Sequence, residues 1–81
     1  MNATAEARPD SVEMQAAGRF RSWVHGLFLD LATQFGAADP ATLARQLVVL
    51  YDGATTTSQM DHTAGAAKTA RDLAQLILNS A

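Results

Sequence analysis

The sequence predicts an all-α protein with three main helices. Two observations support this fold class: apolar residues recur at spacings of three and four over long segments, and residues that start or stop helices separate those segments. A third is composition, because seventeen of the 81 residues are alanine, which has the highest helix propensity. The sequence shows no paired strand-like segments and no internal repeat. The predicted helices cover about residues 10–35, 39–60 and 62–79.

The first predicted helix follows a polar, aperiodic segment, residues 1–9, which we expect to be flexible. Asp10 is the expected N-cap, and Glu13 follows three positions later, as in a capping box. Gly36 ends the helix, since glycine tolerates the left-handed conformation found there. The apolar positions of this helix share one stripe: Ala16, Ala17, Phe20, Val24, Leu27, Leu31 and Phe35.

The second helix begins at the clearest local signal, Asp39-Pro40. Aspartate is a favoured N-cap, and proline at the first helical position loses no hydrogen bond. The segment 48–51 has strand-like composition, but its place inside a long helical pattern favours helix. Gly53 and the threonines at 55–57 lower helix propensity, and we extend this helix to about Met60. One stripe runs along it: Leu43, Leu47, Leu50 and Ala54.

The third helix follows a polar junction at residues 61–63, where either Asp61 or Thr63 is the expected cap. Its main stripe consists of Ala66, Ala70, Leu73 and Ile77.

Composition and charge exclude several classes of function. The formal net charge is −2 and the basic residues are scattered, whereas a nucleic-acid-binding face is usually basic; we expect no direct nucleic-acid contact. The absence of cysteine excludes disulfides and thiolate metal sites. No apolar run approaches the roughly 18 residues of a membrane span, and the N-terminus lacks the apolar stretch of a secretory signal. We expect a cytoplasmic protein.

No motif predicts an enzyme, a metal site or a cofactor. His25 and His62 lie on different predicted segments, and no His-Glu-x-x-His pattern occurs. The four serines lack a nucleophile-elbow context, and the carboxylates are isolated in sequence. We therefore predict neither a catalytic nor a metal-binding residue.

The aromatic residues of the first two helices admit two interpretations. The favoured one is core packing. The alternative is an apolar cavity for a small effector, with Trp23 or Tyr51 as a polar group in its wall; its candidate lining residues are Trp23, Phe28 and Tyr51.

Small size and small side chains favour a homodimer. A chain of this length has few large apolar residues for a self-sufficient core, and such chains often gain stability by oligomerising. Alanines on the last helix and Gly53 would allow close helix approach, so two helices doubled by a two-fold axis would make a four-helix interface with a symmetry mate. The predicted interface residues are Leu43, Leu47, Leu50, Gly53, Ala54, Ala66, Ala70, Leu73, Ala74 and Ile77.

The segment 36–54 resembles the penultimate helix of TetR/AcrR-type transcriptional regulators. In that family a Gly-Ala-x-Asp-Pro turn precedes a Leu-Ala-x-x-Leu-x-x-Leu-x-Asp-Gly helix, and both patterns occur here, at 36–40 and 43–53. Residues 66–74 are similar to the family's alanine-rich final helix, and Arg21-Ser22-Trp23 looks like the helix before the turn. The resemblance covers about residues 20–79.

The resemblance implies a bacterial regulator that forms homodimers through its last two helices and encloses an effector pocket in its C-terminal domain. We expect residues 10–81 to correspond to that regulatory and dimerisation domain, without the helix-turn-helix that binds DNA. The alternative is a stand-alone helical module that docks a different protein. As partners we expect a second copy of the chain and, if the apolar cavity forms, a small apolar effector. We expect no membrane contact and no direct DNA contact.

Overall fold

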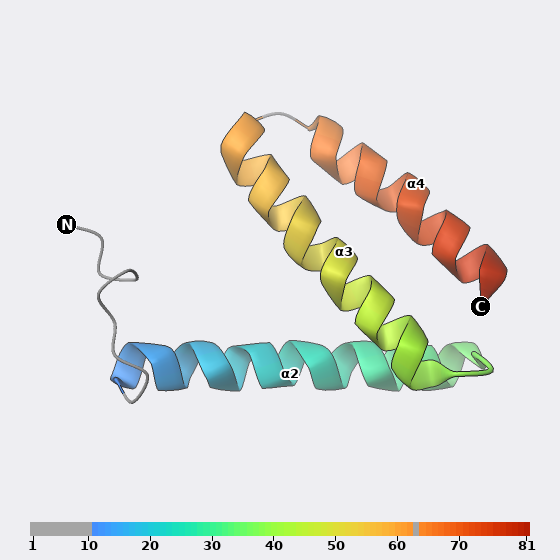
Figure 1. Cartoon of the computed structure of the whole chain (residues 1–81), viewed down its shortest axis with the longest axis horizontal. Coiled ribbons are helices and arrows are strands. Elements are labelled where there is room, and N and C mark those ends of the chain that lie inside the picture. Colours follow the sequence, from blue (N-terminus) through green and yellow to red (C-terminus); the bar gives the residue numbers. More distant parts are fainter. Residues whose placement is uncertain (1–10, 63) are drawn as a thin grey trace.

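The computed structural model describes residues 11–62 and 64–81. These residues form three α-helices and no strand, which confirms the predicted all-α class (Figure 1). Helix α2 is Val12–Phe35, α3 is Pro40–Asp61 and α4 is Gly65–Ser80. The expected flexible segment at 1–9 and the expected cap Asp10 lie outside the described residues. Within the described ranges, none of the helices has the length and hydropathy that crossing a bilayer requires.

Helix α2 has a defined cap at each end. The Ser11 hydroxyl accepts a hydrogen bond from the backbone N–H of Met14 at 3.1 Å, so the helix begins at Val12, slightly later than predicted. At the other end Gly36 has φ of 86°. Its N–H donates to the Thr33 carbonyl, and the Ala37 N–H donates to the Ala32 carbonyl. This pair of bonds is a Schellman motif, and it confirms the predicted role of Gly36.

Helix α3 begins as predicted at Asp39-Pro40. The Asp39 carboxylate accepts hydrogen bonds from the Thr42 N–H at 3.2 Å and from the Thr42 hydroxyl at 2.7 Å. These hydrogen bonds lower the pKa of Asp39, and the bond from the Thr42 hydroxyl has the largest effect. The helix continues to Asp61, one residue beyond the predicted end, and stops where His62 adopts a left-handed conformation with φ of 54°.

The predicted start of the last helix was wrong. Helix α4 begins at Gly65 rather than at residue 62, and Ala64 at its N-cap position makes no side-chain hydrogen bond. Asp61 is not its cap because that residue completes α3, and Thr63 lies outside the described residues. Asp61 therefore ends one helix without capping the next.

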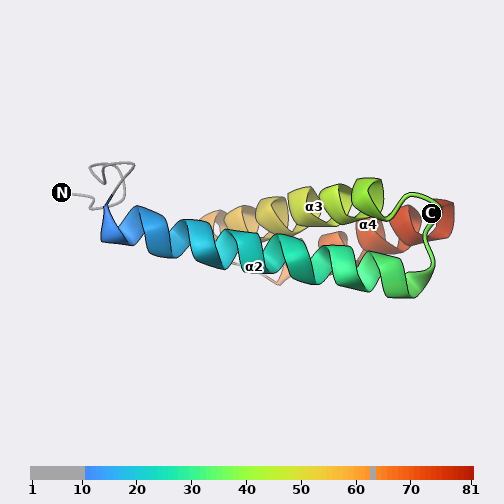
Figure 2. The ribbon, with the colours of Figure 1, turned by 90° about the horizontal axis from the view of Figure 1, so that it is seen from below.

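The three helices form a thin assembly. Helix α3 crosses the C-terminal half of α2, and α4 runs back beside α3 (Figure 1). Seen edge-on, α2 lies along one side of α3 (Figure 2), and the Cα trace extends only 13 Å along its shortest axis. A slab this thin has little interior.

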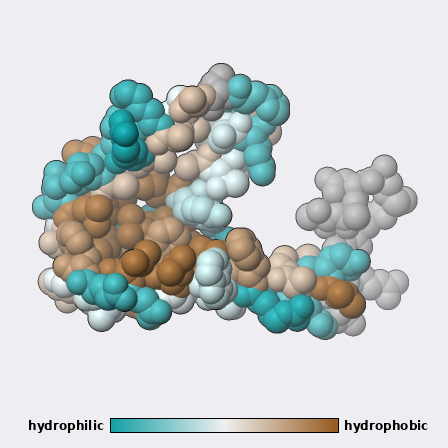
Figure 3. Space-filling model, turned by 180° about the vertical axis from the view of Figure 1, so that it is seen from behind, coloured by the Kyte–Doolittle hydropathy of each residue, from teal (hydrophilic) through white to brown (hydrophobic). Residues whose placement is uncertain are grey.

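The core lies where the end of α2 meets α3 and the end of α4. Its buried centre is Ala32, Leu43 and Ala44, and partly buried apolar residues pack against it: Phe28, Ala37, Leu47, Ile77 and Leu78. Among the residues that the structure describes, Val24 and Val48 are the other buried hydrophobic ones. Apolar side chains also gather on the surface of α2 and around this junction (Figure 3). Much apolar area is thus left in solvent.

Candidate functional site

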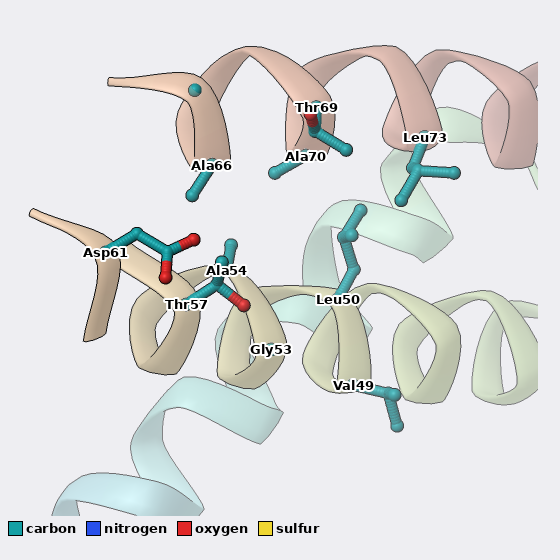
Figure 4. A pocket seen from close by; sticks show the side chains of 11 residues that line it. Val49, Leu50, Gly53, Ala54, Thr57, Asp61, Ala66, Thr69, Ala70 and Leu73 are labelled. Carbon is teal, nitrogen blue, oxygen red and sulfur yellow. The ribbon is translucent and has the colours of Figure 1, made fainter. Parts of the chain in front are cut away.

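An open groove separates α3 from α4. It has a volume of about 490 Å³. Figure 4 shows Leu50 and Ala54 pointing from α3 toward α4, and Ala66, Ala70 and Leu73 pointing back toward α3. The residues of this α3–α4 groove are Val49, Leu50, Gly53, Ala54, Thr57, Asp61, Gly65, Ala66, Thr69, Ala70 and Leu73.

The groove stays open because its facing residues are small. Gly53 and Ala54 on α3 lie across from Ala66 and Ala70 on α4. Residues four apart stand one above the other on a helix face, so Ala66 and Ala70 repeat the same short side chain over two turns. Glycine and alanine cannot span the space between the helices, so that space is left unfilled.

Exposed apolar side chains surround the groove. Val49 is 65% exposed, Leu73 is 44% exposed and the neighbouring Leu76 is 63% exposed. No residue of α4 is buried, although the helix has apolar residues along one side. Monomeric soluble proteins rarely expose contiguous apolar patches of this kind unless the patch binds something.

The structure divides the ten predicted interface residues between the groove and the core. Those that line the groove are Leu50, Gly53, Ala54, Ala66, Ala70 and Leu73. Leu43 is buried at the centre of the core, and Leu47 and Ile77 pack against it. Ala74 is half-buried and lines neither described cavity. Leu43 is covered inside one chain and Leu47 and Ile77 are partly covered, so the groove residues are the more accessible to a partner.

An ion pair that the sequence did not reveal joins α2 to α3. The Arg21 guanidinium donates to both carboxylate oxygens of Asp52, at 3.1 Å and 2.6 Å. Hydrogen bonding to Arg21 lowers the pKa of Asp52, and the same bond raises the pKa of Arg21. Both side chains are substantially exposed, so the pair links the two helices at their crossing but adds little stability.

A second, shallower cavity lies beside this ion pair. Gly18, Arg21, Ser22 and His25 of α2 line it. All four residues come from one helix, so the cavity lacks an opposite wall. It offers no enclosed site for a ligand.

Of the three aromatic residues predicted to border an effector pocket, two come together and Trp23 does not. Phe28 and Tyr51 face each other across α2 and α3, with ring centroids 6.0 Å apart and planes at 59°. Trp23 instead stacks on Phe20 at 6.0 Å and is 62% exposed. At about 100° per helical residue, Trp23 and Phe28 point about 140° apart. None of the three predicted residues lines either described cavity.

Among residues 11–62 and 64–81, no group of three or more His, Asp or Glu side chains is placed to hold a metal ion. His25 and His62 are both exposed and lie on separate elements.

Comparisons of the chain with protein-family models, with curated proteins and with solved structures found no match.

Proposed function

We propose that this chain is the C-terminal regulatory and dimerisation domain of a TetR-like transcriptional regulator, and that the α3–α4 groove is its homodimer interface. The observation that carries the proposal is an unfilled apolar groove between the last two helices, with exposed Val49 and Leu73 at its edges. Six of the ten residues predicted for the interface line that groove.

The physical argument starts from exposed apolar area. Burial of apolar surface contributes roughly 25 cal/mol per Å², so a patch that includes Val49, Leu73 and Leu76 favours association. A second copy would bring the same patch, and a two-fold axis makes such a surface complementary to itself. Small residues in the groove floor would let the partner's side chains enter between the two helices.

The resemblance to TetR/AcrR-type regulators supports the same surface. In that family the last two helices of each subunit form the dimer interface, and α3 and α4 are the elements that match them. The segment with the strongest resemblance contributes Leu50 and Gly53 to the groove. Regulation in this proposal rests on dimerisation, because Trp23 is not brought near Phe28 and Tyr51.

The test is the mass in solution of variants on the groove, measured by analytical ultracentrifugation at micromolar concentration. Val49→Asp and Leu73→Asp each place a charge in the proposed interface, and we expect each to halve the mass of the native assembly. Met60→Asp is the matched control, because Met60 is also on α3, is 74% exposed and does not line the groove. Circular dichroism checks that each variant remains helical.

A native chain that stays monomeric, or an assembly with the same mass after both groove substitutions, would overturn the proposal. If the folded monomer instead takes up a different purified protein at the groove, the chain is a stand-alone interaction module and the homodimer proposal fails.

A further inference from the structure

A second apolar surface lies on α2, away from the groove. It consists of Ala16, Phe20, Trp23, Leu27 and Leu31, and we call it the α2 stripe. Phe20 is 58%, Trp23 62% and Leu31 47% exposed. At about 100° per residue the stripe spans about 80° of the helix, and its centre lies about 100° from that of the face that packs on α3. The stripe adjoins the core at Leu31, which projects about 20° from the buried Val24, and it extends from there around the helix, away from α3.

Two opposite charges flank the same edge of the stripe. Around the helix axis, Arg19 and Asp30 project only about 20° apart. Along the axis they lie about 16 Å apart, because residue 30 is eleven positions after residue 19 and each residue rises about 1.5 Å. Neither makes an ion pair or a hydrogen bond with any other residue that the structure describes. Arg21 is different, because Asp52 already pairs with it.

We propose that the α2 stripe binds the α2 stripe of a second copy, with the two helices antiparallel and a two-fold axis near residues 24 and 25. In this register Arg19 of each copy meets Asp30 of the other, because the axis lies midway between them. In a parallel pair the two-fold axis would place the charged edges of the two helices on opposite sides of the interface, so neither Arg19–Asp30 contact would form. The charge pattern therefore selects both the occupant and its direction.

The same register interleaves the apolar side chains. Placed antiparallel about this axis, the five stripe residues of one helix alternate in height with the five of the other, as knobs and holes do in paired helices. Trp23 comes beside Leu27 of the second copy, and the Phe20–Trp23 stack is covered. A shift that placed residue 31 directly opposite residue 16 would separate Arg19 from Asp30 along the helix and lose the interleaving.

This inference goes beyond the proposed function because it adds a second face to the chain. The groove lies between α3 and α4 and the stripe lies on α2, so both faces can be occupied at once. Two self-complementary faces on one chain give a closed tetramer when their axes intersect at right angles, a larger closed ring at certain other angles, and an open string of copies when the axes do not intersect. The native assembly is then larger than the dimer that the groove alone would form.

The experiment uses charge reversal with the native chain as reference. The two-fold axis creates two Arg19–Asp30 contacts, and Arg19→Glu or Asp30→Arg makes both of them repulsive. We expect each variant to weaken the α2 association roughly tenfold. The double variant Arg19→Glu/Asp30→Arg restores the attraction with the signs exchanged, and we expect it to recover the native affinity. Arg71→Glu, an exposed charge change on α4, is the control and leaves the α2 association unchanged.

Trp23 supplies a readout specific to this face, because it is the only tryptophan of the chain. Its emission shifts to shorter wavelength as rising concentration covers the ring, and Arg19→Glu moves that shift to higher concentration. The titration is run on the chain with Leu73→Asp, so that the groove does not contribute. An emission maximum that does not change with concentration would overturn the inference, as would single and double variants with equal affinity.

The two proposals fail separately. If Leu73→Asp halves the mass while Arg19→Glu changes neither mass nor emission, the groove dimer stands and the α2 pairing is wrong. If Arg19→Glu weakens association while Leu73→Asp and Val49→Asp do not, the α2 pairing stands and the proposed function loses its interface.

Discussion

The junction of α2 with α3 and the pairing of α3 with α4 use apolar residues in opposite ways. At the junction Leu43 and Ala32 are buried, the turn is closed by Gly36, and Asp39 caps the next helix. Between α3 and α4 the facing residues are small, the groove is open, and the N-terminus of α4 has no side-chain cap. The first region completes its contacts within one chain, whereas the second leaves its apolar residues exposed to solvent.

The strongest test of this difference is truncation of Leu43. The side chain is only 3% exposed at the centre of the core, and Leu→Ala at such sites costs about 2–5 kcal/mol. We expect Leu43→Ala to unfold a large fraction of the protein at 25 °C, as followed by circular dichroism. Leu76→Ala, at a site that is 63% exposed, should change the stability of the dissociated chain by less than about 0.5 kcal/mol. Equal effects would remove the distinction between the two regions.

The turn of the junction provides the second test. A Cβ at Gly36 would meet no atom within 4 Å, but its φ is +86°. Gly36→Ala therefore costs conformational strain alone, about 1–2 kcal/mol, and we expect a lower urea midpoint. Gly36→Asn should lose less, since asparagine tolerates this conformation. Gly18→Ala, inside α2 with open space around it, should stabilise the chain by up to about 1 kcal/mol.

The smallest expected effect is the loss of stability at acidic pH. Hydrogen bonds from Thr42 and from Arg21 lower the pKa values of Asp39 and Asp52 below their ordinary value of 3.8. Their contribution to stability is therefore fully present above that value and is lost as pH falls through the lowered pKa of each group. We expect the melting temperature to level off above about pH 5 and to fall below about pH 4.

Asp52→Asn removes one of these two contributions. We expect it to lower the melting temperature by only a few degrees at neutral pH, because the pair is exposed, and the difference from the native chain should vanish at the acid end. Asp61→Asn on the same helix is the control, and both variants are compared in the Leu73→Asp chain because Asp61 lines the groove. An Asp52→Asn difference that persists unchanged at low pH would show that the ion pair does not contribute.

The helices could be predicted from the sequence because their signals are local. Asp39-Pro40 and Gly36 act within four residues of themselves, and the structure places both as expected. The junction at 61–63 was harder because Asp61 is equally suited to end one helix or to start another. The structure uses it at the end of α3, and the left-handed His62 follows.

The site could be predicted only in part, because spacing shows that residues share a face but not what covers it. Leu43 and Leu50 are on one stripe of α3, yet Leu43 meets the core and Leu50 lines the groove. The Arg21–Asp52 pair joins residues 31 apart in sequence, and their meeting depends on where α2 crosses α3. Helix geometry alone predicts that Trp23 and Phe28 lie on different faces of α2, because a spacing of five residues rotates their directions far apart.

The missing cap of α4 has a consequence for the order in which the molecule opens. A helix without a capping side chain and without a fully buried residue buries little apolar area, and such segments open locally at small free-energy cost while the rest stays folded. The backbone amides of α4 then exchange with solvent sooner than those of α3, where Leu43 and Val48 are buried. A partner bound in the groove would oppose this local opening of α4. Binding would therefore slow hydrogen exchange most at the backbone amides of α4.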